Sequence, residues 1–438
     1  MTRVAYTTLG CRVNQVDTQE LQGRLEARGC ETADVAAADV VVINTCTVTA
    51  RAELSDRQAI RRARRENPGA RIVVTGCWAQ TNPGAVAALP GVDLVVGVSD
   101  RHRLDVLVAD LGRETRSISG DVRGGVPLAP ALRTGRAGAR SRAFLKIQDG
   151  CQHRCAFCIV PFARGASRSR ASVVVVEQAR ALVDAGHPEI VLTGIDMGHY
   201  GADMSPRTSL AALLRLLVEV NGLRWLRLSS VLPAYFTEEL IEVLTGSPIV
   251  APHLHIPLQS GSDRVLRRMR RPYTAAMYRR LVERLSVAIP DLGLGTDVIA
   301  GFPGESDADA TATEETVRSL PFTYLHVFPY SDRAGTEAAG LDGHVNPAVV
   351  GDRARRLRAL DRERRRQFRQ AMLGITREVV VLGTRDRATG WLTGLTGNYV
   401  EVLFDGPESL VGQVTTVRPT KLDGDRLLGV HDANGRVA

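Results

Sequence analysis

The stretch Cys151-Gln-His-Arg-Cys155-Ala-Phe-Cys158 brings three cysteines together within eight residues, in the spacing C-x3-C-x2-C. It follows Arg142–Asp149, a segment whose residues favour a strand. A [4Fe-4S] cluster usually takes four cysteines, one for each iron, so three would leave one iron open to a small molecule. The alternative is a zinc knuckle, but structural zinc takes four ligands, and no histidine or cysteine follows Cys158 at a suitable distance. The motif therefore predicts an iron–sulfur cluster with an open iron.

Three further cysteines lie near the N-terminus, and each comes just after a predicted strand. They are Cys11, Cys46 and Cys77. Because equivalent ends of parallel strands share one edge of a sheet, we expect these thiols to converge in space. Gly10 and Gly76 would let the backbone approach a bulky cluster. Unrelated buried cysteines are the alternative, but they would not all fall at the same end of consecutive strands. The pattern predicts a second three-cysteine cluster.

The seven cysteines of this 438-residue chain occur without a recognisable export signal. In a reducing compartment, cysteines in such a chain indicate metal binding or catalysis rather than disulfides. Cys30 has no partner in either pattern, which favours a small buried side chain over a ligand. No apolar run reaches the ~18 residues needed to span a bilayer. We therefore expect a cytoplasmic protein with no membrane partner.

The charge of the chain favours a nucleic-acid partner. The net charge is +8 and the isoelectric point is about 9.4. Nearly all the basic residues are arginines, with lysine only at Lys146 and Lys421. Arginine binds phosphate with two hydrogen bonds and stacks on bases, so RNA is the expected partner.

The alternation of apolar strands and amphipathic helices predicts an α/β protein of three parts. Residues 1–114 form a domain with a mainly parallel sheet, 115–140 a basic linker, 141–370 a partial barrel of six β/α units, and 371–438 a small β-barrel of the oligonucleotide-binding type. Six units cannot close as eight do, so the central barrel stays open. The cysteine loop follows its first strand, at the edge where such barrels carry their chemistry.

The predicted elements can be given by residue range. The N-terminal strands are Val4–Thr8, Val40–Asn44, Ile72–Thr75 and Leu94–Val96, with helices over 15–28 and 50–65. The core strands are Phe144–Gln148, Ile190–Thr193, Trp225–Ser229, His253–Pro257, Gly295–Ile299 and Tyr324–Phe328, with helices over 174–185, 210–220, 237–244 and 264–288. The C-terminal strands are Arg377–Leu382, Gly390–Thr393, Tyr399–Phe404 and Gln413–Val417. Residues 352–370 form a very basic helix, which either contacts RNA or only connects two parts of the chain.

These motifs together resemble the methylthiotransferases of the radical S-adenosylmethionine (SAM) superfamily, and the resemblance covers essentially the whole chain. The matching segments are Thr8–Asn14 (TLGCRVN), Asn44–Thr49 (NTCTVT), Val74–Gln80 (VTGCWAQ) and Lys146–Gly165, which contains the cysteine loop. Within the family the chain is most similar to the branch that modifies N6-threonylcarbamoyladenosine at tRNA position 37. Sister branches act on isopentenyladenosine-37 or on a ribosomal-protein aspartate, and these are the alternatives within the class.

The resemblance implies two [4Fe-4S] clusters, an auxiliary one in the N-terminal domain and one in the radical SAM core, with SAM bound at the core cluster. It also implies that the C-terminal barrel is a TRAM domain. The SAM contacts it suggests are Phe157, Gly194, Ser229, Gln259 and Asp297. For Ser229, Gln259 and Asp297 the alternative is a hydrogen-bonding role at the end of a strand. The segment Thr193–Asp196 (TGID) departs from the Gly-Gly-Glu that the family often carries there.

The family implies that SAM serves as radical source and methyl donor, and that C2 of the base receives a methylthio group. No side chain alone activates such a C–H bond, so the cofactors carry the chemistry. The implied partners are the tRNA anticodon loop and an electron donor such as flavodoxin or ferredoxin. An alternative of another class is a nonenzymatic RNA-binding protein whose metal sites are structural.

Overall fold

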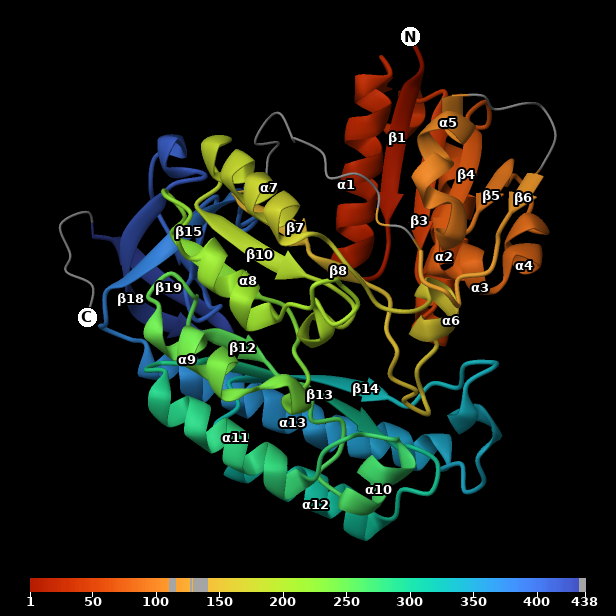
Figure 1. Ribbon diagram of the computed structural model, residues 1–438. Coiled ribbons are helices and arrows are strands. Elements are labelled where there is room, and N and C mark those ends of the chain that lie inside the picture. The colour runs from red at the N-terminus through yellow and green to blue at the C-terminus, as the bar shows by residue number, and fades with distance from the viewer. Residues whose placement is uncertain (110–115, 127, 129–140, 433–438) are drawn as a thin grey trace.

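The computed structural model describes residues 1–109, 116–126, 128 and 141–432 (Figure 1). The N-terminal part is a fully parallel sheet with the strand order β2-β1-β3-β4-β5-β6. Its elements are β1 (Arg3–Thr8), α1 (Arg12–Ala27), β2 (Glu31–Thr32), β3 (Val40–Thr45), α2 (Ala50–Glu66), β4 (Arg71–Gly76), α3 (Cys77–Thr81), α4 (Pro83–Ala87), β5 (Leu94–Val96), α5 (Leu104–Ala109) and β6 (Arg116–Ile118).

The four strands predicted in this domain are present, and the sheet has two more. Every residue of β3 is buried, as expected for a central strand covered by helices on both faces. Strand β6 lies in the range that the sequence suggested as a linker, but it pairs with β5 and extends the sheet. Residues 129–140 of that suggested linker lie outside the described residues.

The central part is an open parallel barrel. Its first three strands pair in the order β11-β10-β7 and its last three in the order β12-β13-β14. Leu226 of β11 joins the halves, because its N–H donates to the oxygen of Ile249 and its oxygen accepts from the N–H of Ala251. Its elements are β7 (Arg142–Lys146), β8 (Gln148–Asp149), α6 (Val160–Arg164), β9 (Arg168–Ser169), α7 (Ser172–Asp184), β10 (Glu189–Thr193), α8 (Leu210–Leu217), β11 (Trp225–Leu228), α9 (Glu238–Gly246), β12 (His253–His255), α10 (Asp263–Arg268), α11 (Ala275–Ala288), β13 (Gly293–Ala300), α12 (Asp307–Ser319), β14 (Tyr324–Pro329) and α13 (Pro347–Ala371). The predicted six-unit partial barrel is confirmed.

The prediction of one continuous helix over 264–288 is wrong. Helix α10 ends at Arg268, and Arg270 adopts a φ of 57°. Pro272 follows, and a residue before proline avoids the helical region. Thr274 then caps α11 by accepting a hydrogen bond from the backbone N–H of Met277. The sequence carried the signals for this break.

The C-terminal part is a closed barrel in the order β15-β16-β17-β19-β18. Its strands are β15 (Arg377–Arg385), β16 (Leu392–Thr396), β17 (Glu401–Phe404), β18 (Val414–Asp423) and β19 (Arg426–His431). The sequence predicted four of the five strands and missed β19, which closes the barrel between β17 and β18. The barrel packs against the core, because Arg227 of β11 donates hydrogen bonds to the backbone oxygens of Thr396 and Gly397.

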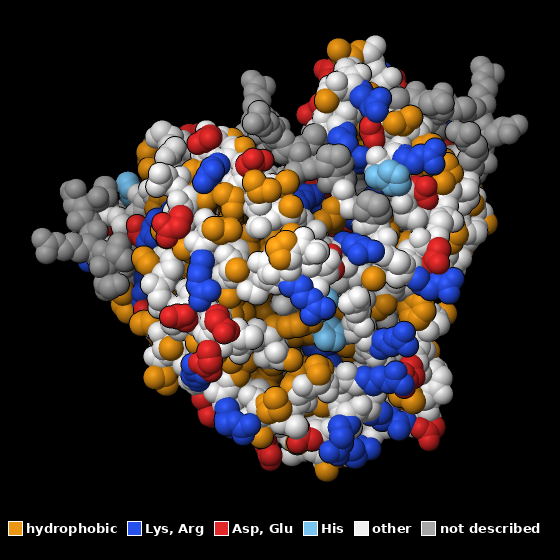
Figure 2. Space-filling model, viewed as in Figure 1, with side chains coloured by type: hydrophobic (Ala, Val, Ile, Leu, Met, Phe, Trp, Pro, Cys, Tyr) orange, Lys and Arg blue, Asp and Glu red, His pale blue; other side chains and the backbone are white. Residues whose placement is uncertain are grey.

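The predicted basic helix is the C-terminal portion of α13, which lies along the core below β14 in Figure 1. Ala354, Leu357 and Leu360 are buried on one of its faces. Figure 2 shows Lys and Arg side chains gathered on the lower right of one face of the molecule, where Figure 1 places β14, α10 and α12. Among the described residues, no helix combines the length and apolar character required to cross a membrane.

Candidate functional site: two sets of three thiols

The N-terminal cysteines follow three neighbouring strands at one edge of the sheet. Cys11 is the residue that caps α1 after β1, Cys46 follows β3, and Cys77 opens α3 directly after β4. The backbone comes very close here, because a Cβ atom at Gly10 would lie 2.6 Å from the Cβ of Cys46 and 2.8 Å from its Sγ. Gly10 also has a φ of 92°, which only glycine adopts readily. The strand ends thus bring the predicted residues together.

Asn14 on α1 fixes this edge of the sheet. It is fully buried, and its Nδ2 donates to the backbone oxygens of Leu9 and Thr45, at 2.8 and 2.9 Å. Its Oδ1 lies 4.0 Å from the Sγ of Cys77. One side chain therefore ties the ends of β1 and β3 to the third thiol.

The thiols of this set fit a metal cluster. Burial raises the pKa of Cys46 to about 12, and the neighbouring thiols of Cys77 and Cys11 add to that shift. Burial also raises the pKa of Cys77, which Arg164 partly offsets. A metal would replace the protons of these thiols and leave three thiolates as ligands. Cys30, which the sequence predicted to be a buried side chain, is partly buried and packs against an apolar core of the same domain.

The cysteine loop lies between β8 and α6, at the carboxyl-terminal edge of the open barrel. The N–H of Cys151 donates to the oxygen of Gly165 at 2.9 Å, and the N–H of Cys158 donates to the oxygen of Cys155 at 3.0 Å. Burial raises the pKa of Cys158 to about 11. Burial and the carboxylate of Asp196 raise the pKa of Cys151. These three thiols therefore also form a donor set that fits a cluster with an open iron.

Polar side chains surround the thiols of the loop, and sequence reasoning did not name them as site residues. The Cys151 thiol donates to Oδ2 of Asp196 at 3.7 Å, and the Tyr235 hydroxyl donates to the same oxygen at 3.1 Å. His153 lies 2.7 Å from that hydroxyl. Arg271 donates to the Sγ of Cys155 at 3.2 Å. Asp196 follows β10 at a strand end, which could have indicated it, whereas Arg271 carries no such signal.

A large cavity opens on the cysteine loop. Its volume is about 1100 Å³, and Cys151, Cys155 and Cys158 all line it. Gln80 and residues 120–123 of the N-terminal part line it as well. None of the five predicted SAM contacts is among its lining residues. The cavity therefore gives access to the thiols from the side where the two domains meet.

A buried network of charges joins the two domains directly beneath the thiols. Its carboxylates are Asp17 and Glu20 of α1 and Asp149 of β8, and its cations are Arg101, Lys146, Arg164 and Arg170. Arg164 pairs with Asp17 and with Asp149 at 2.9 Å each. Burial alone would raise the pKa of Asp17, but Lys146, Arg101 and Arg164 lower it to about 2. Paired charges of this kind hold the domains in one arrangement.

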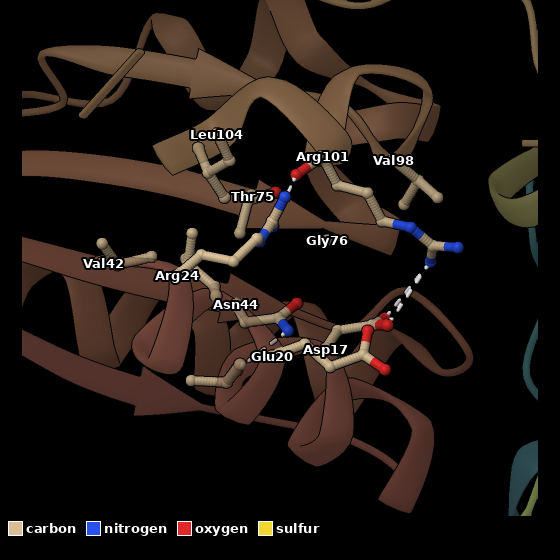
Figure 3. A pocket seen from close by; sticks show the side chains of 12 residues that line it. Asp17, Glu20, Arg24, Val42, Asn44, Thr75, Gly76, Val98, Arg101 and Leu104 are labelled. Atoms are coloured by element: carbon tan, nitrogen blue, oxygen red, sulfur yellow. Dashed lines mark hydrogen bonds and ion pairs between the residues drawn. The ribbon is translucent and has the colours of Figure 1, made fainter. Parts of the chain in front are cut away.

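Figure 3 shows the N-terminal half of this network. Arg101 reaches across a small cavity to the carboxylate of Asp17, while Arg24 donates to the backbone oxygen of Arg101 at 3.1 Å. The cavity has a volume of about 20 Å³, which is room for one water molecule. It is a packing feature of the network and too small for a cofactor.

The five predicted SAM contacts take different positions. Phe157 packs edge-on against Phe302, and Gly194 lies close to Gln148 and Met197. Ser229 accepts a hydrogen bond from Arg12 at 3.3 Å. The N–H of Gln259 donates to the backbone oxygen of Asp297 at 2.8 Å, and Asp297 pairs with His255 and His326 at 3.2 Å each. Gly194, Ser229 and Gln259 follow strands of the barrel, Phe157 lies in the cysteine loop and Asp297 lies within β13. Their contact with SAM stays a prediction.

Comparison with known proteins agrees with this arrangement. Residues 3–97 match the model of a family described as "Uncharacterized protein family UPF0004", and residues 145–317 match the Radical SAM superfamily. The chain is 42% identical over 432 residues to the threonylcarbamoyladenosine tRNA methylthiotransferase MtaB of Bacillus subtilis (strain 168), covering 96% of this chain and 94% of that protein. It is 38% identical to the enzyme of the same name from Aquifex aeolicus, covering 95% of this chain and 99% of the relative.

A relative with a different name is nearly as similar. The tRNA-2-methylthio-N(6)-dimethylallyladenosine synthase of Parafrankia sp. is 39% identical over 417 residues, covering 93% of this chain and 84% of that one. Among solved structures, the radical SAM methyltransferase TsrM from Kitasatospora setae aligns with a TM-score of 0.58 at 19% identity, covering 77% of this chain and 74% of that one. This structural likeness shows the fold alone.

The open barrel and its cysteine loop define a radical SAM enzyme. The second thiol set and the full-length relatives narrow the class, and the chain belongs to the radical SAM methylthiotransferase family. Its cofactors are accordingly [4Fe-4S] clusters and SAM. The resemblance stated from the sequence is confirmed.

Proposed function

We infer that this protein methylthiolates C2 of N6-threonylcarbamoyladenosine at position 37 of tRNA. The observation that carries the proposal is that the two domains on either side of one interface each carry a three-thiol set, and that Arg164 bridges this interface by hydrogen bonds to Asp149 and Asn14. The curated relatives of nearly full length that bear the name MtaB support the choice of substrate. A structural metal protein would have no use for two separate ligand sets of three thiols each.

The residues that would hold the cofactors follow from the two donor sets. Cys151, Cys155 and Cys158 would hold the cluster that binds SAM, and Cys11, Cys46 and Cys77 would hold the auxiliary cluster. When bound, these cofactors supply the electron, the radical and the sulfur and methyl groups that the reaction needs.

The remaining side chains position these groups and control their surroundings. Asn14 and Gly10 fix the edge of the sheet at the N-terminal thiols, and Arg271 places a positive charge beside Cys155. Arg164 places another beside Cys77, where it favours the thiolate over the thiol. The ion pairs of Arg164 keep both domains in register while a base lies between them.

The proposed substrate suits an open barrel. Position 37 lies in a single-stranded loop, so turning the base out costs less than the few kcal/mol of a paired base. The exposed arginines would hold the RNA backbone without reading its sequence. We further propose a cytoplasmic location, since tRNA is found there, and an electron donor of the flavodoxin or ferredoxin type.

The test is an in vitro assay with protein reconstituted under anaerobic conditions. Transcripts that carry threonylcarbamoyladenosine-37, isopentenyladenosine-37 or unmodified adenosine-37 are incubated with SAM and a reductant, and their nucleosides are identified by mass spectrometry. We expect the 2-methylthio product on the first transcript only. A product on the isopentenyl transcript alone, or on none of them, contradicts the proposal.

A further inference from the structure

Three arginines surround one tyrosine at the floor of the open barrel, where the N-terminal domain, the core and the C-terminal barrel meet. The guanidinium carbons of Arg12, Arg142 and Arg227 lie 5.7, 5.9 and 5.1 Å from the ring centroid of Tyr399. Tyr399 projects from the turn between β16 and β17 with a φ of 71°, a conformation that is costly for a bulky residue. The four side chains come from all three parts of the molecule.

The carboxylates near this cluster do not balance its charge. Glu189 is fully buried, pairs with Arg227 at 2.6 Å and lies 3.6 Å from Arg142. Among the described residues, Arg12 has no carboxylate partner, and its guanidinium donates only to the hydroxyls of Ser229 and Tyr399, at 3.3 and 2.7 Å. Three guanidinium groups against one carboxylate leave an excess of two positive charges. Such an excess in a half-buried place favours an anionic ligand.

One donor of the cluster makes no hydrogen bond. Nη1 of Arg142 is buried and lies 3.6 Å from Glu189 as an ion pair, but within the part of the chain that the structure describes it has no hydrogen-bond partner. A cavity of about 240 Å³ lies beside it and is lined by Arg142, Tyr324, His326 and Tyr399. Arg365, Arg369 and Glu401 also line it, and Glu401 is exposed to solvent. Burial keeps the neighbouring His253 neutral by lowering its pKa, so this ring adds no charge.

We propose that Arg12, supported by Arg142, binds the threonine carboxylate of the substrate base and thereby selects threonylcarbamoyladenosine over uncharged analogues. Guanidinium and carboxylate form paired, charge-assisted hydrogen bonds. Arg12 directly follows Cys11 in the chain, and its guanidinium reaches from that end of α1 to Ser229 and Tyr399 in the barrel. An isopentenyl group carries no charge and would leave the arginines unpaired, which selects against it. This inference rests on the proposed function and names the residue that reads the substrate.

The test measures binding, so it does not depend on turnover. Reconstituted protein without SAM is titrated with anticodon stem-loops whose position 37 carries threonylcarbamoyladenosine or the methyl ester of its carboxyl group. We expect the wild-type protein to prefer the acid by about 10- to 100-fold, the range of a charge-assisted hydrogen bond. Arg12→Gln should lose this preference while its affinity for the ester stays the same, and Arg12→Lys should keep part of it.

Two controls separate the possible outcomes. Arg62→Gln changes an arginine on α2 whose side chain is 79% exposed, and it should leave the preference intact. Iron content of the Arg12 variants should equal that of the wild type, which excludes damage to the adjacent thiol set. If Arg12→Gln weakens both RNAs equally, Arg12 binds a backbone phosphate and the proposal is overturned. If the wild type forms the product but the variant keeps its preference, only this inference fails and the proposed function stands.

Discussion

The two thiol sets are assembled by the fold in opposite ways. The cysteine loop places Cys151, Cys155 and Cys158 on one short segment, so its geometry is local and its thiols are only partly buried. The N-terminal set depends on three parallel strands ending at one edge. Cys46 and Cys77 are 5% and 4% exposed, whereas Cys11 is solvent-exposed. A local motif can be recognised from spacing alone, whereas a dispersed one becomes visible only once the strands are assigned. The dispersed set should also depend more strongly on the fold around it.

The largest expected effect comes from removing all three thiols of the cysteine loop while the N-terminal set stays intact. Replacing Cys151, Cys155 and Cys158 by Ala should reduce the iron content from about eight to about four atoms, because each set holds one cluster of about four irons. Cleavage of SAM on reduction should be lost with it. Iron analysis and chromatography of 5′-deoxyadenosine measure both. An unchanged iron content would show that the loop holds no cluster.

Cys46→Ala tests the role of the N-terminal thiol set. It removes a thiol of the N-terminal set and leaves the cysteine loop intact, so SAM should still be cleaved while the methylthio product disappears. Cys30→Ala is the matched control, because Cys30 lies in the same domain but packs against its apolar core. It should change neither readout. Product formation by the Cys46 variant would mean that the dispersed set does not carry the sulfur.

Arg164→Met tests whether the network beneath both sets holds the domains together. Arg164 is 2% exposed and pairs with Asp17 and Asp149. Removing one partner of a buried ion pair leaves an uncompensated charge and costs about 3–5 kcal/mol. Urea denaturation should show this loss, and limited proteolysis should cut between the domains sooner. The exposed pair Arg284–Glu238 provides the control, since Arg284→Met should cost less than about 1 kcal/mol.

The pH dependence of the metal-free protein should reveal the buried thiol. The pKa of Cys46 rises from 9.0 to about 12 on folding. Above pH 9.0 the thiol of the unfolded state loses its proton, while that of the folded state keeps it. The contribution of this thiol to the free energy of unfolding is therefore fully present below pH 9.0 and is lost as the pH approaches 12. The slope from this one thiol is about 1.4 kcal/mol per pH unit. Denaturation at several pH values should show a shallower decline for Cys46→Ser than for the wild type, and equal slopes would contradict the burial argument.

Most of the fold could be predicted from the sequence, because strands and helices leave periodic patterns. The six core strands and the placement of Cys11, Cys46 and Cys77 after strands agree with the structure. The short strands β2 and β6 have too few residues to show an alternation of apolar and polar side chains. Strand β19 was not predicted from the sequence either. The charges beneath the thiols could not be predicted, since Asp17 and Arg164 meet only through the packing of two domains. The same holds for Arg12 and Tyr399, which lie in different parts of the chain.

The smallest expected effect lies away from both thiol sets, in the C-terminal barrel. Deleting the barrel would also remove Tyr399 from the core, so point variants on its outer surface are the sharper test. Arg418 and Lys421 of β18 have side chains that are 52% and 67% exposed. If both contact phosphates, replacing them by Gln should weaken tRNA binding and reduce the slope of log K against log salt by about 0.7 to 0.9 for each contact.

Filter binding across a salt series measures that slope, and SAM cleavage without RNA should be unchanged because both thiol sets lie elsewhere. The matched control is the pair Arg215 and Arg284, which are 49% and 50% exposed on helices of the core. Glutamine at these two positions should leave the slope as it is. If instead the core pair changes the slope and the barrel pair does not, the barrel serves to hold Tyr399 in place and the RNA backbone runs over the core.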